Sequence, residues 1–161
     1  VLSGQAGPGI IMSDICEQNG LVLADFSPQT TERVHELLPP LAMRSNPIDM
    51  GPAWYDSGAI KGIVQAVLED KNIDAIILCI MFASANRASV EILSHLLTQQ
   101  KINKPIICCF SSPIGIWDEE IRRFEQSGIP NYPTPERAAK TLVNLVRFKK
   151  ISKRRDLHGN P

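Results

Sequence analysis

The sequence predicts one α/β domain with a doubly wound parallel sheet covered by helices on both faces, a three-layer α/β/α architecture. Residues 74–81 and 105–110 are apolar at nearly every position, a pattern typical of central parallel strands buried on both faces. Amphipathic segments with helical periodicity separate these runs along the chain. A length of 161 residues with 43% hydrophobic content suits one soluble domain with a sizeable core.

The chain opens with a glycine-rich turn between a strand end and a helix. Val1 and Leu2 are apolar, residues 3–9 have the sequence SGQAGPG, and Gly20 closes the helix that follows. The apolar positions of that helix are Ile10, Ile11, Ile15 and Cys16. The first amides of a helix have no acceptor within it and lie at the positive end of its dipole, so this turn predicts an anion site.

The next part of the chain predicts a strand, a helix and a structured loop. Residues 21–26 are a short strand candidate. Ser27 caps a helix that has Pro28 at its first position and ends before a Pro-Pro pair. Residues 41–55 lack periodicity and contain Asn-Pro and Gly-Pro turns, which favours a loop holding one extended stretch.

The middle of the chain repeats helix and strand. Asp56 or Ser57 caps a helix over residues 59–70, which leads to the first buried strand. Residues 84–86 lead into a second helix, which precedes the other buried strand. The inward positions of these two helices are Ile60, Ile63, Val64, Val67, Val90, Ile92, Leu93, Leu96 and Leu97.

The C-terminal part predicts two helices around an edge strand. A helix over residues 117–126 ends near Gly128, and Pro130 restricts residues 129–132 to a short edge strand. A Thr-Pro-Glu sequence at residues 134–136 begins the last helix. The buried positions of that helix are Ala138, Ala139, Leu142, Leu145 and Val146.

Strands and helices alternate four or five times, so the predicted sheet is doubly wound in the flavodoxin-like manner. We expect this domain to cover residues 1–148, with its first strand truncated at the amino end, and residues 149–161 to form a disordered basic tail. Such sheets bind ligands beyond the carboxyl ends of their strands. The glycine-rich turn, residues 81–86 and residues 110–116 all leave the sheet there, so three loops share one rim.

Composition and charge narrow the function classes. The chain has 17 Lys plus Arg and 17 Asp plus Glu residues, which gives no indication of a nucleic-acid or membrane partner. Its longest apolar run, residues 75–83, is far shorter than the ~20 residues of a membrane helix. No secretory signal is visible. The four cysteines form no CxxC pair, so we expect small buried hydrophobic residues rather than metal ligands or disulfides. That composition suits a reducing, cytoplasmic setting.

The glycine-rich turn has two interpretations. Its three glycines either let the first helix pack closely on its strand or expose helix amides to a phosphate, and spacing alone does not choose between them. The spacing departs from GxGxxG and no suitably placed acidic residue follows, which argues against a nicotinamide cofactor. Residues 1–32 contain no Lys or Arg, so an anion at this turn would be bound by backbone dipoles alone.

Most other polar candidates favour structural or solvated roles. Asp49, in an Asn-Pro-Ile-Asp turn, is expected to accept backbone N–H bonds rather than to border the ligand rim. Asp14 and Glu17 are expected to be solvated on the first helix, as are the basic residues of the tail. Trp54 and Tyr55 lie in an irregular loop, where they either mark an interface or cover the sheet edge.

Four segments taken together resemble one enzyme family. They are GPGIIMSDICEQNGL at residues 7–21, LPP at 38–40 with NPID at 46–49, DAIILCIMF at 74–82, and GIPNYPTPERAAKTLVNLVRF at 128–148. These segments are similar to the last flavodoxin-like domain of the NDP-forming acyl-CoA synthetases, the counterpart of the carboxy-terminal, beta-type domain of succinyl-CoA synthetase. The resemblance covers nearly the whole chain.

The resemblance implies a domain of an acid–thiol ligase. Enzymes of this family convert acyl-CoA, phosphate and ADP to acid, CoA and ATP through a phosphorylated histidine, which two helix amino termini from related domains cradle. The first helix resembles one of these two, so the implied phosphate-binding residues are Gly4, Gln5, Ala6, Gly7, Gly9 and Ile10. The resemblance implies no catalytic residue, metal or cofactor bound by this domain itself, whereas the parent enzyme is expected to use CoA, ADP or ATP, and Mg.

The resemblance also implies that a partner carries the phosphorylated histidine. His35, His95 and His158 all lack the Ser-His-Thr-Gly context of the family's histidine, and the first two fall within predicted helices. Neither a CoA-binding Rossmann unit nor an ATP-grasp module is visible. We therefore expect an isolated domain that is inactive alone and docks against a histidine-bearing domain or subunit of the same enzyme. That docking surface would also serve homodimer formation by the isolated domain.

Two other classes of function fit the sequence less well. A receiver-like regulatory module needs an acidic cluster after its first strand and a phosphoacceptor Asp after its third, where this chain has Ser3-Gly4 and the apolar residues 80–83. A flavodoxin needs aromatic side chains around a flavin, for which the candidates are Phe82, Trp54 and Trp117. The alternative to the ligase domain is thus a stand-alone flavodoxin-like regulatory or interaction module without catalysis.

Overall fold

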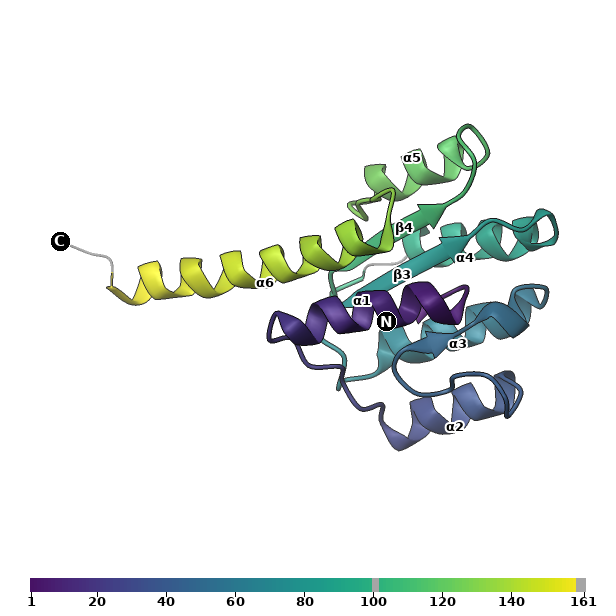
Figure 1. The fold of residues 1–161 in the computed structure, drawn as a ribbon, viewed down its shortest axis with the longest axis horizontal. Coiled ribbons are helices and arrows are strands. Elements are labelled where there is room, and N and C mark those ends of the chain that lie inside the picture. The colour runs from purple at the N-terminus through teal and green to yellow at the C-terminus, as the bar shows by residue number, and fades with distance from the viewer. Residues whose placement is uncertain (100–101, 159–161) are drawn as a thin grey trace.

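The fold is built around a parallel sheet of four strands. A computed structural model describes residues 1–99 and 102–158 and orders the strands β2-β1-β3-β4 (Figure 1). The strands are β1 (Leu2–Ser3), β2 (Ile48–Asp49), β3 (Ile76–Met81) and β4 (Ile106–Ser111). An isolated parallel bridge between Cys108 and Asn131 extends the sheet beyond β4. The doubly wound, flavodoxin-like architecture predicted from the sequence is confirmed.

Helices cover both faces of this sheet (Figure 1). α1 (Ala6–Gln18) and α6 (Pro135–His158) lie on one face. α3 (Ser57–Glu69), α4 (Arg87–Gln99) and α5 (Asp118–Gln126) lie on the other, and α2 (Pro28–Leu37) packs beside α3. Two short 3-10 turns, η1 (Gly51–Ala53) and η2 (Ser84–Asn86), precede α3 and α4. A tight hairpin cannot join parallel strands, so helices form the crossover connections between them.

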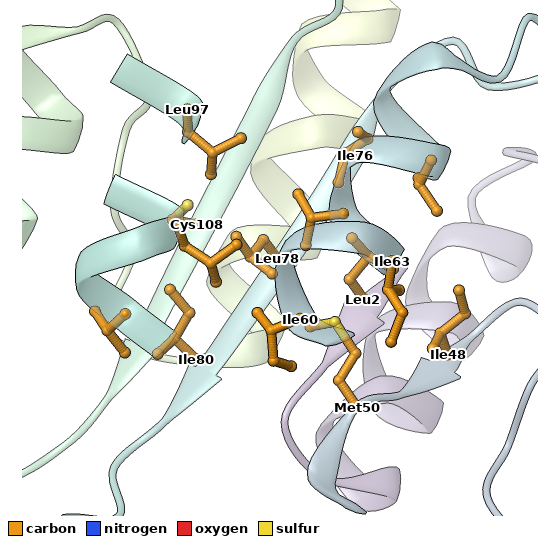
Figure 2. Close-up of a cluster of buried hydrophobic side chains, with 14 of the residues drawn as sticks. Leu2, Ile48, Met50, Ile60, Ile63, Ile76, Leu78, Ile80, Leu97 and Cys108 are labelled. Atoms are coloured by element: carbon orange, nitrogen blue, oxygen red, sulfur yellow. The ribbon is translucent and has the colours of Figure 1, made fainter. Parts of the chain in front are cut away.

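Alternate residues of the strands fill two cores, one on each face of the sheet. Leu78 and Ile80 of β3 pack toward α3 and α4, as Figure 2 shows. Ile77 and Cys79, which point the other way, pack against α1 and α6 at Met12, Cys16, Ala138, Ala139 and Leu142. Burying one large aliphatic side chain contributes roughly 1.5–3 kcal/mol. The almost continuous apolar pattern of β3 therefore reflects burial on both faces.

Side-chain caps fix where two of the helices begin. The hydroxyl of Ser27 accepts a hydrogen bond from the third residue of α2, as predicted. Asp56, rather than Ser57, caps α3, because its carboxylate accepts the amides of Gly58 and Ala59 at 2.9 and 3.0 Å. Each such cap contributes about 1 kcal/mol to folding.

Residues 21–26 do not form the strand that their apolar pattern predicts. They run as an irregular connection between α1 and α2. The carbonyls of Ala24 and Asp25 accept hydrogen bonds from the side chains of Asn46 and Asn72 instead of from a neighbouring strand. β2 pairs with β1 on the side away from β3, so the position next to β1 is already filled.

The last helix is longer than predicted. α6 continues through His158, so residues 149–158 are helical where the sequence predicts a disordered tail, and residues 159–161 lie outside the described part. Lys and Arg are good helix formers, which favours this continuation past the sheet (Figure 1). Leu145, predicted to be buried, is 43% exposed. Among the described residues, no helix has the length and apolar character needed to cross a membrane.

All four cysteines are free thiols and buried, which confirms the prediction that they serve as small core residues. Cys79 and Cys109 are partners across β3 and β4. A hydrogen bond with Cys79, together with burial, raises the pKa of the Cys109 thiol, and burial raises the pKa of Cys108. Both shifts favour the neutral thiol, which suits the role of these β4 cysteines as buried core residues.

Asp70, at the end of α3, makes the folded state sensitive to acid. Burial alone would raise its pKa, but hydrogen bonds from the amides of Asn72 and Ser27 and from the hydroxyls of Thr30 and Ser27 hold the pKa below its ordinary value of 3.8. A carboxyl group of this kind stabilises the fold above its unfolded-state pKa, and the contribution is lost as the pH falls through the folded-state pKa.

Asp70→Asn should lower the thermal unfolding temperature at pH 7 and lessen its further decline between pH ~5 and ~2, as followed by circular dichroism. Asp74→Asn is the matched control, because Asp74 is exposed nearby in the sequence. An acid-induced decline of the same size in Asp70→Asn and in the unmodified chain would contradict this assignment.

Candidate functional site

The carboxyl edge of the sheet gathers the segments that leave all four strands, because the strands run parallel. Tyr55, Phe82 and Ile114, which follow β2, β3 and β4, are exposed large apolar side chains. α1 begins at the same edge, directly after β1. A ligand or a partner domain approaching this edge therefore meets both a helix amino terminus and exposed apolar groups.

At this edge α1 presents free amides. Its N-cap, Gln5, has an extended backbone and makes no side-chain cap. Within residues 1–99 and 102–158, the N–H groups of Ala6 and Gly7 have no hydrogen-bond acceptor, and Pro8 has no N–H to donate. Gly7 is exposed, with open space where a side chain would lie. These donors sit at the positive end of a 13-residue helix, which favours an anion.

Gly4 and Gln5, by contrast, use their amides within the fold. The Gly4 N–H donates to the carbonyl of Cys79 at 2.9 Å and so continues the pairing of β1 with β3. The Gln5 N–H donates to the hydroxyl of Ser3 at 3.3 Å, and that hydroxyl donates to the Gln5 carbonyl at 2.6 Å. The two residues therefore shape the turn and have no amide left for a ligand.

Gly9 and Ile10, the remaining predicted site residues, lie further along α1. Gly9 is buried, and a Cβ there would lie 3.3 Å from Ser3 and 3.4 Å from Pro47, so this glycine serves close packing. Ile10 and Ile11 are 46% and 40% exposed, although the sequence predicts them at the apolar positions of the helix. The buried residues of α1 are instead Gly9, Met12, Ser13 and Cys16, whose small members let the helix lie close to the sheet.

Five of the six predicted residues therefore divide between two roles, and Ile10 lies exposed further along α1. Gly4, Gln5 and Gly9 support the turn, as the packing interpretation predicts. The phosphate interpretation depends on the free amides of Ala6 and Gly7 and stays a prediction.

Trp54 lies directly behind the turn. Its side chain is only 4% exposed, and a Cβ on Gly4 would come within 2.3 Å of its Nε1 atom. Position 4 therefore accepts glycine alone while the indole ring stays in place. Tyr55 is 69% exposed. Trp54 thus covers the sheet edge, and Tyr55 stays available at the surface.

Sequence reasoning missed Arg87, a cationic side chain at the same edge. It is the first residue of α4, and its guanidinium carbon lies 5.6 Å from the ring centroid of Trp117. Phe82 contacts the same indole edge-on at 6.2 Å between centroids. A cation–π contact at an exposed site contributes about 0.5–1 kcal/mol. A basic residue soon after a buried strand is the signal that could have indicated it.

The other sequence candidates have structural or surface roles. The Asp49 carboxylate accepts the amide of Gly51 at 2.9 Å, as predicted for its turn. Asp14 and Glu17 are exposed on α1, and His35 and His95 are exposed on α2 and α4. In the part of the chain that the structure describes, no group of three or more His, Cys, Asp or Glu side chains is arranged to hold a metal ion.

Comparison with known proteins identifies the family. Residues 1–152 match the family model of the Ligase-CoA domain, and the chain belongs to that family. The chain is 32% identical over 153 residues to an ADP-forming acetate–CoA ligase I of Archaeoglobus fulgidus, with 94% of this chain and 21% of the relative covered. It is 29% identical over 157 residues to the alpha subunit of an ADP-forming acetate–CoA ligase II of Pyrococcus furiosus, with 91% and 33% covered.

Two solved structures share this fold. A protein of Pyrococcus horikoshii OT3 superposes with a TM-score of 0.78 at 25% identity, covering 90% of this chain and 34% of that one. A dinucleotide-forming acetyl-coenzyme A synthetase of Ca. Korarchaeum cryptofilum, solved with phosphate and ADP, superposes with a TM-score of 0.76 at 20% identity, covering 92% and 32%. This second likeness concerns the fold alone.

The family resemblance predicted from the sequence is therefore confirmed. This chain spans between 21% and 33% of the length of the two curated relatives described above. The finer correspondence with the beta-type domain of succinyl-CoA synthetase stays a prediction.

Two substitutions at glycines of the turn should have opposite effects on stability. Gly4→Ala places a Cβ against the Trp54 ring and should lower the free energy of unfolding by about 1–3 kcal/mol. Gly7→Ala meets open space within a helix, so stability should be unchanged or rise by up to ~1 kcal/mol. Urea unfolding of both variants checks this pair, and equal stabilities would contradict the tight contact at Gly4.

Proposed function

We propose that this chain is a domain of an NDP-forming acyl-CoA synthetase and that the amides of Ala6 and Gly7 bind the phosphoryl group of a phosphohistidine carried by a partner domain. The observation that carries the proposal is the pair of free amides at the positive end of α1, at the carboxyl edge of the sheet. The family match and the ADP-forming acetate–CoA ligases among its relatives support the reaction class.

Backbone amides suit a phosphoryl group in transit. A charge at a helix terminus gains roughly 0.3–1 kcal/mol, or up to ~2 kcal/mol when partly buried. A free phosphate would therefore bind weakly, whereas a phosphoryl group delivered on a histidine needs only well-placed donors. Neutral amides hold such a group without a covalent bond or a competing proton, so the phosphohistidine stays reactive.

The rest of the reaction would take place on other parts of the parent enzyme. That enzyme would convert acyl-CoA, ADP and phosphate to acid, CoA and ATP, with CoA, the nucleotide and Mg bound outside this domain. Two of the relatives are alpha subunits, which supports an enzyme assembled from several domains or chains. The exposed side chains of Tyr55, Phe82 and Ile114, which follow strands that end at the same edge, give such a partner apolar groups to cover.

Gly7→Asp tests the role of the free amides. Asp is favoured in the first turn of a helix and meets open space here, so the variant should fold as well as the unmodified chain. Its carboxylate would occupy the amides and repel the phosphoryl group. In the assembled synthetase, ATP formation from acyl-CoA, ADP and phosphate should slow by about 10-fold or more.

Gly7→Asn is the matched control, because it adds nearly the same volume without charge and should retain most of the activity. An Asp variant that folds and forms ATP at the unmodified rate would refute the proposal. The 161-residue chain alone should form no ATP from these substrates, and a clear signal in the same assay would refute its dependence on a partner.

A further inference from the structure

Residues 50–54 brace the turn that precedes α1. The amide of Met50 donates to the carbonyl of Ser3 at 2.7 Å, at the end of β1. A Cβ on Gly51 would lie 3.0 Å from the carbonyl oxygen of Gly4, so these two backbones are already close. The Trp54 ring then fills the space beside Gly4 itself. Three consecutive contacts therefore converge on the last residues before the helix.

Trp54 is itself tied to a third loop of the carboxyl edge. Its carbonyl accepts a hydrogen bond of 2.7 Å from the hydroxyl of Ser89 in the first turns of α4. That hydroxyl lies 3.3 Å from the hydroxyl of Ser57 at the start of α3. The starts of α1, α3 and α4 thus meet around one residue.

Among the described residues, the indole N–H of Trp54 has no hydrogen-bond partner, although its nitrogen atom is buried. A buried donor without an acceptor is costly, and evolution usually removes it or pairs it. Phenylalanine would avoid that cost at a similar shape. The larger indole instead fills the space beside Gly4.

We propose that Trp54 is a positioning residue for the anion-binding end of α1, acting through Gly4 to fix the direction of the Ala6 and Gly7 amides. This inference rests on the proposed function for the identity of the anion, but not for the geometry of the turn. The indole contacts no phosphoryl group, since its Nε1 atom is buried behind the loop.

The test uses the full 161-residue chain, amide NMR and inorganic phosphate as the probe. Trp54→Leu should speed hydrogen exchange of the Gly4 amide, which bonds to Cys79, by ~10-fold or more relative to amides in the middle of β4. It should also weaken the phosphate-dependent shifts of the Ala6 and Gly7 amides by roughly fivefold in apparent affinity. Trp54→Phe should have smaller effects in the same direction.

Trp117→Leu is the matched control. Trp117 is 1% exposed and packs against Phe110 of β4. Its indole N–H also lacks a partner within the described part of the chain. This variant should lose stability but leave the exchange of Gly4 and the phosphate shifts unchanged. If Trp54→Leu does no more than Trp117→Leu to these two readouts, Trp54 is an ordinary core residue and the inference is wrong.

Combining Gly4→Ala with Trp54→Leu distinguishes the packing of Trp54 against Gly4 from its positioning of the Ala6 and Gly7 amides. Removing the ring makes room for a Cβ at position 4, so Gly4→Ala should lower the unfolding temperature less in the Trp54→Leu background. The double variant should still bind phosphate more weakly than the unmodified chain. Recovery of the full phosphate response would overturn the inference.

Failure of the proposed function would give results different from failure of the inference about Trp54. If phosphate leaves the Ala6 and Gly7 amides of the unmodified chain unshifted, and Gly7→Asp is fully active in the synthetase, the phosphohistidine proposal fails. Faster exchange of Gly4 in Trp54→Leu would still support the role of Trp54 in fixing the turn.

Discussion

The rest of the structure depends on where β1 stops pairing with β3. Leu2 and Ser3 lie opposite Leu78 and Cys79, and the Gly4 amide makes one last bond to the carbonyl of Cys79. The chain then turns away from the sheet and begins α1 within two residues. This short pairing fixes the helix amino terminus at the carboxyl edge and decides which amides are satisfied by the sheet and which are left free.

Much of the fold could be predicted because its signals are local. The buried strands β3 and β4 are apolar on both faces, and α3 shows a clear helical period with a capping Asp56. Residues 21–26 carry an equally apolar pattern, but β2, a distant segment, takes the place beside β1. The exposure of Ile10 and Leu145 likewise depends on how α1 and α6 lie on the sheet, which helical periodicity does not specify.

The candidate site also combines local features that the sequence predicts with distant contacts that it does not. A glycine-rich turn before a helix is enough to predict unpaired amides, since every helix begins with them. The amide of Gly4 is not free because it bonds to Cys79, which lies far along the sequence. The need for glycine at position 4 depends on Trp54, and the cation at the edge, Arg87, belongs to another helix. These contacts arise only when the loops of the parallel strands are brought to one edge.

Pro8 at the third position of α1 has a consequence for how complete this end of the helix is. Because proline carries no amide hydrogen, this helix offers one donor fewer at its amino terminus than a helix with another residue at that position. A phosphoryl group on a histidine nitrogen has three terminal oxygens, each able to accept. Under the proposed function, the donor that Pro8 lacks would have to come from a different domain or from solvent.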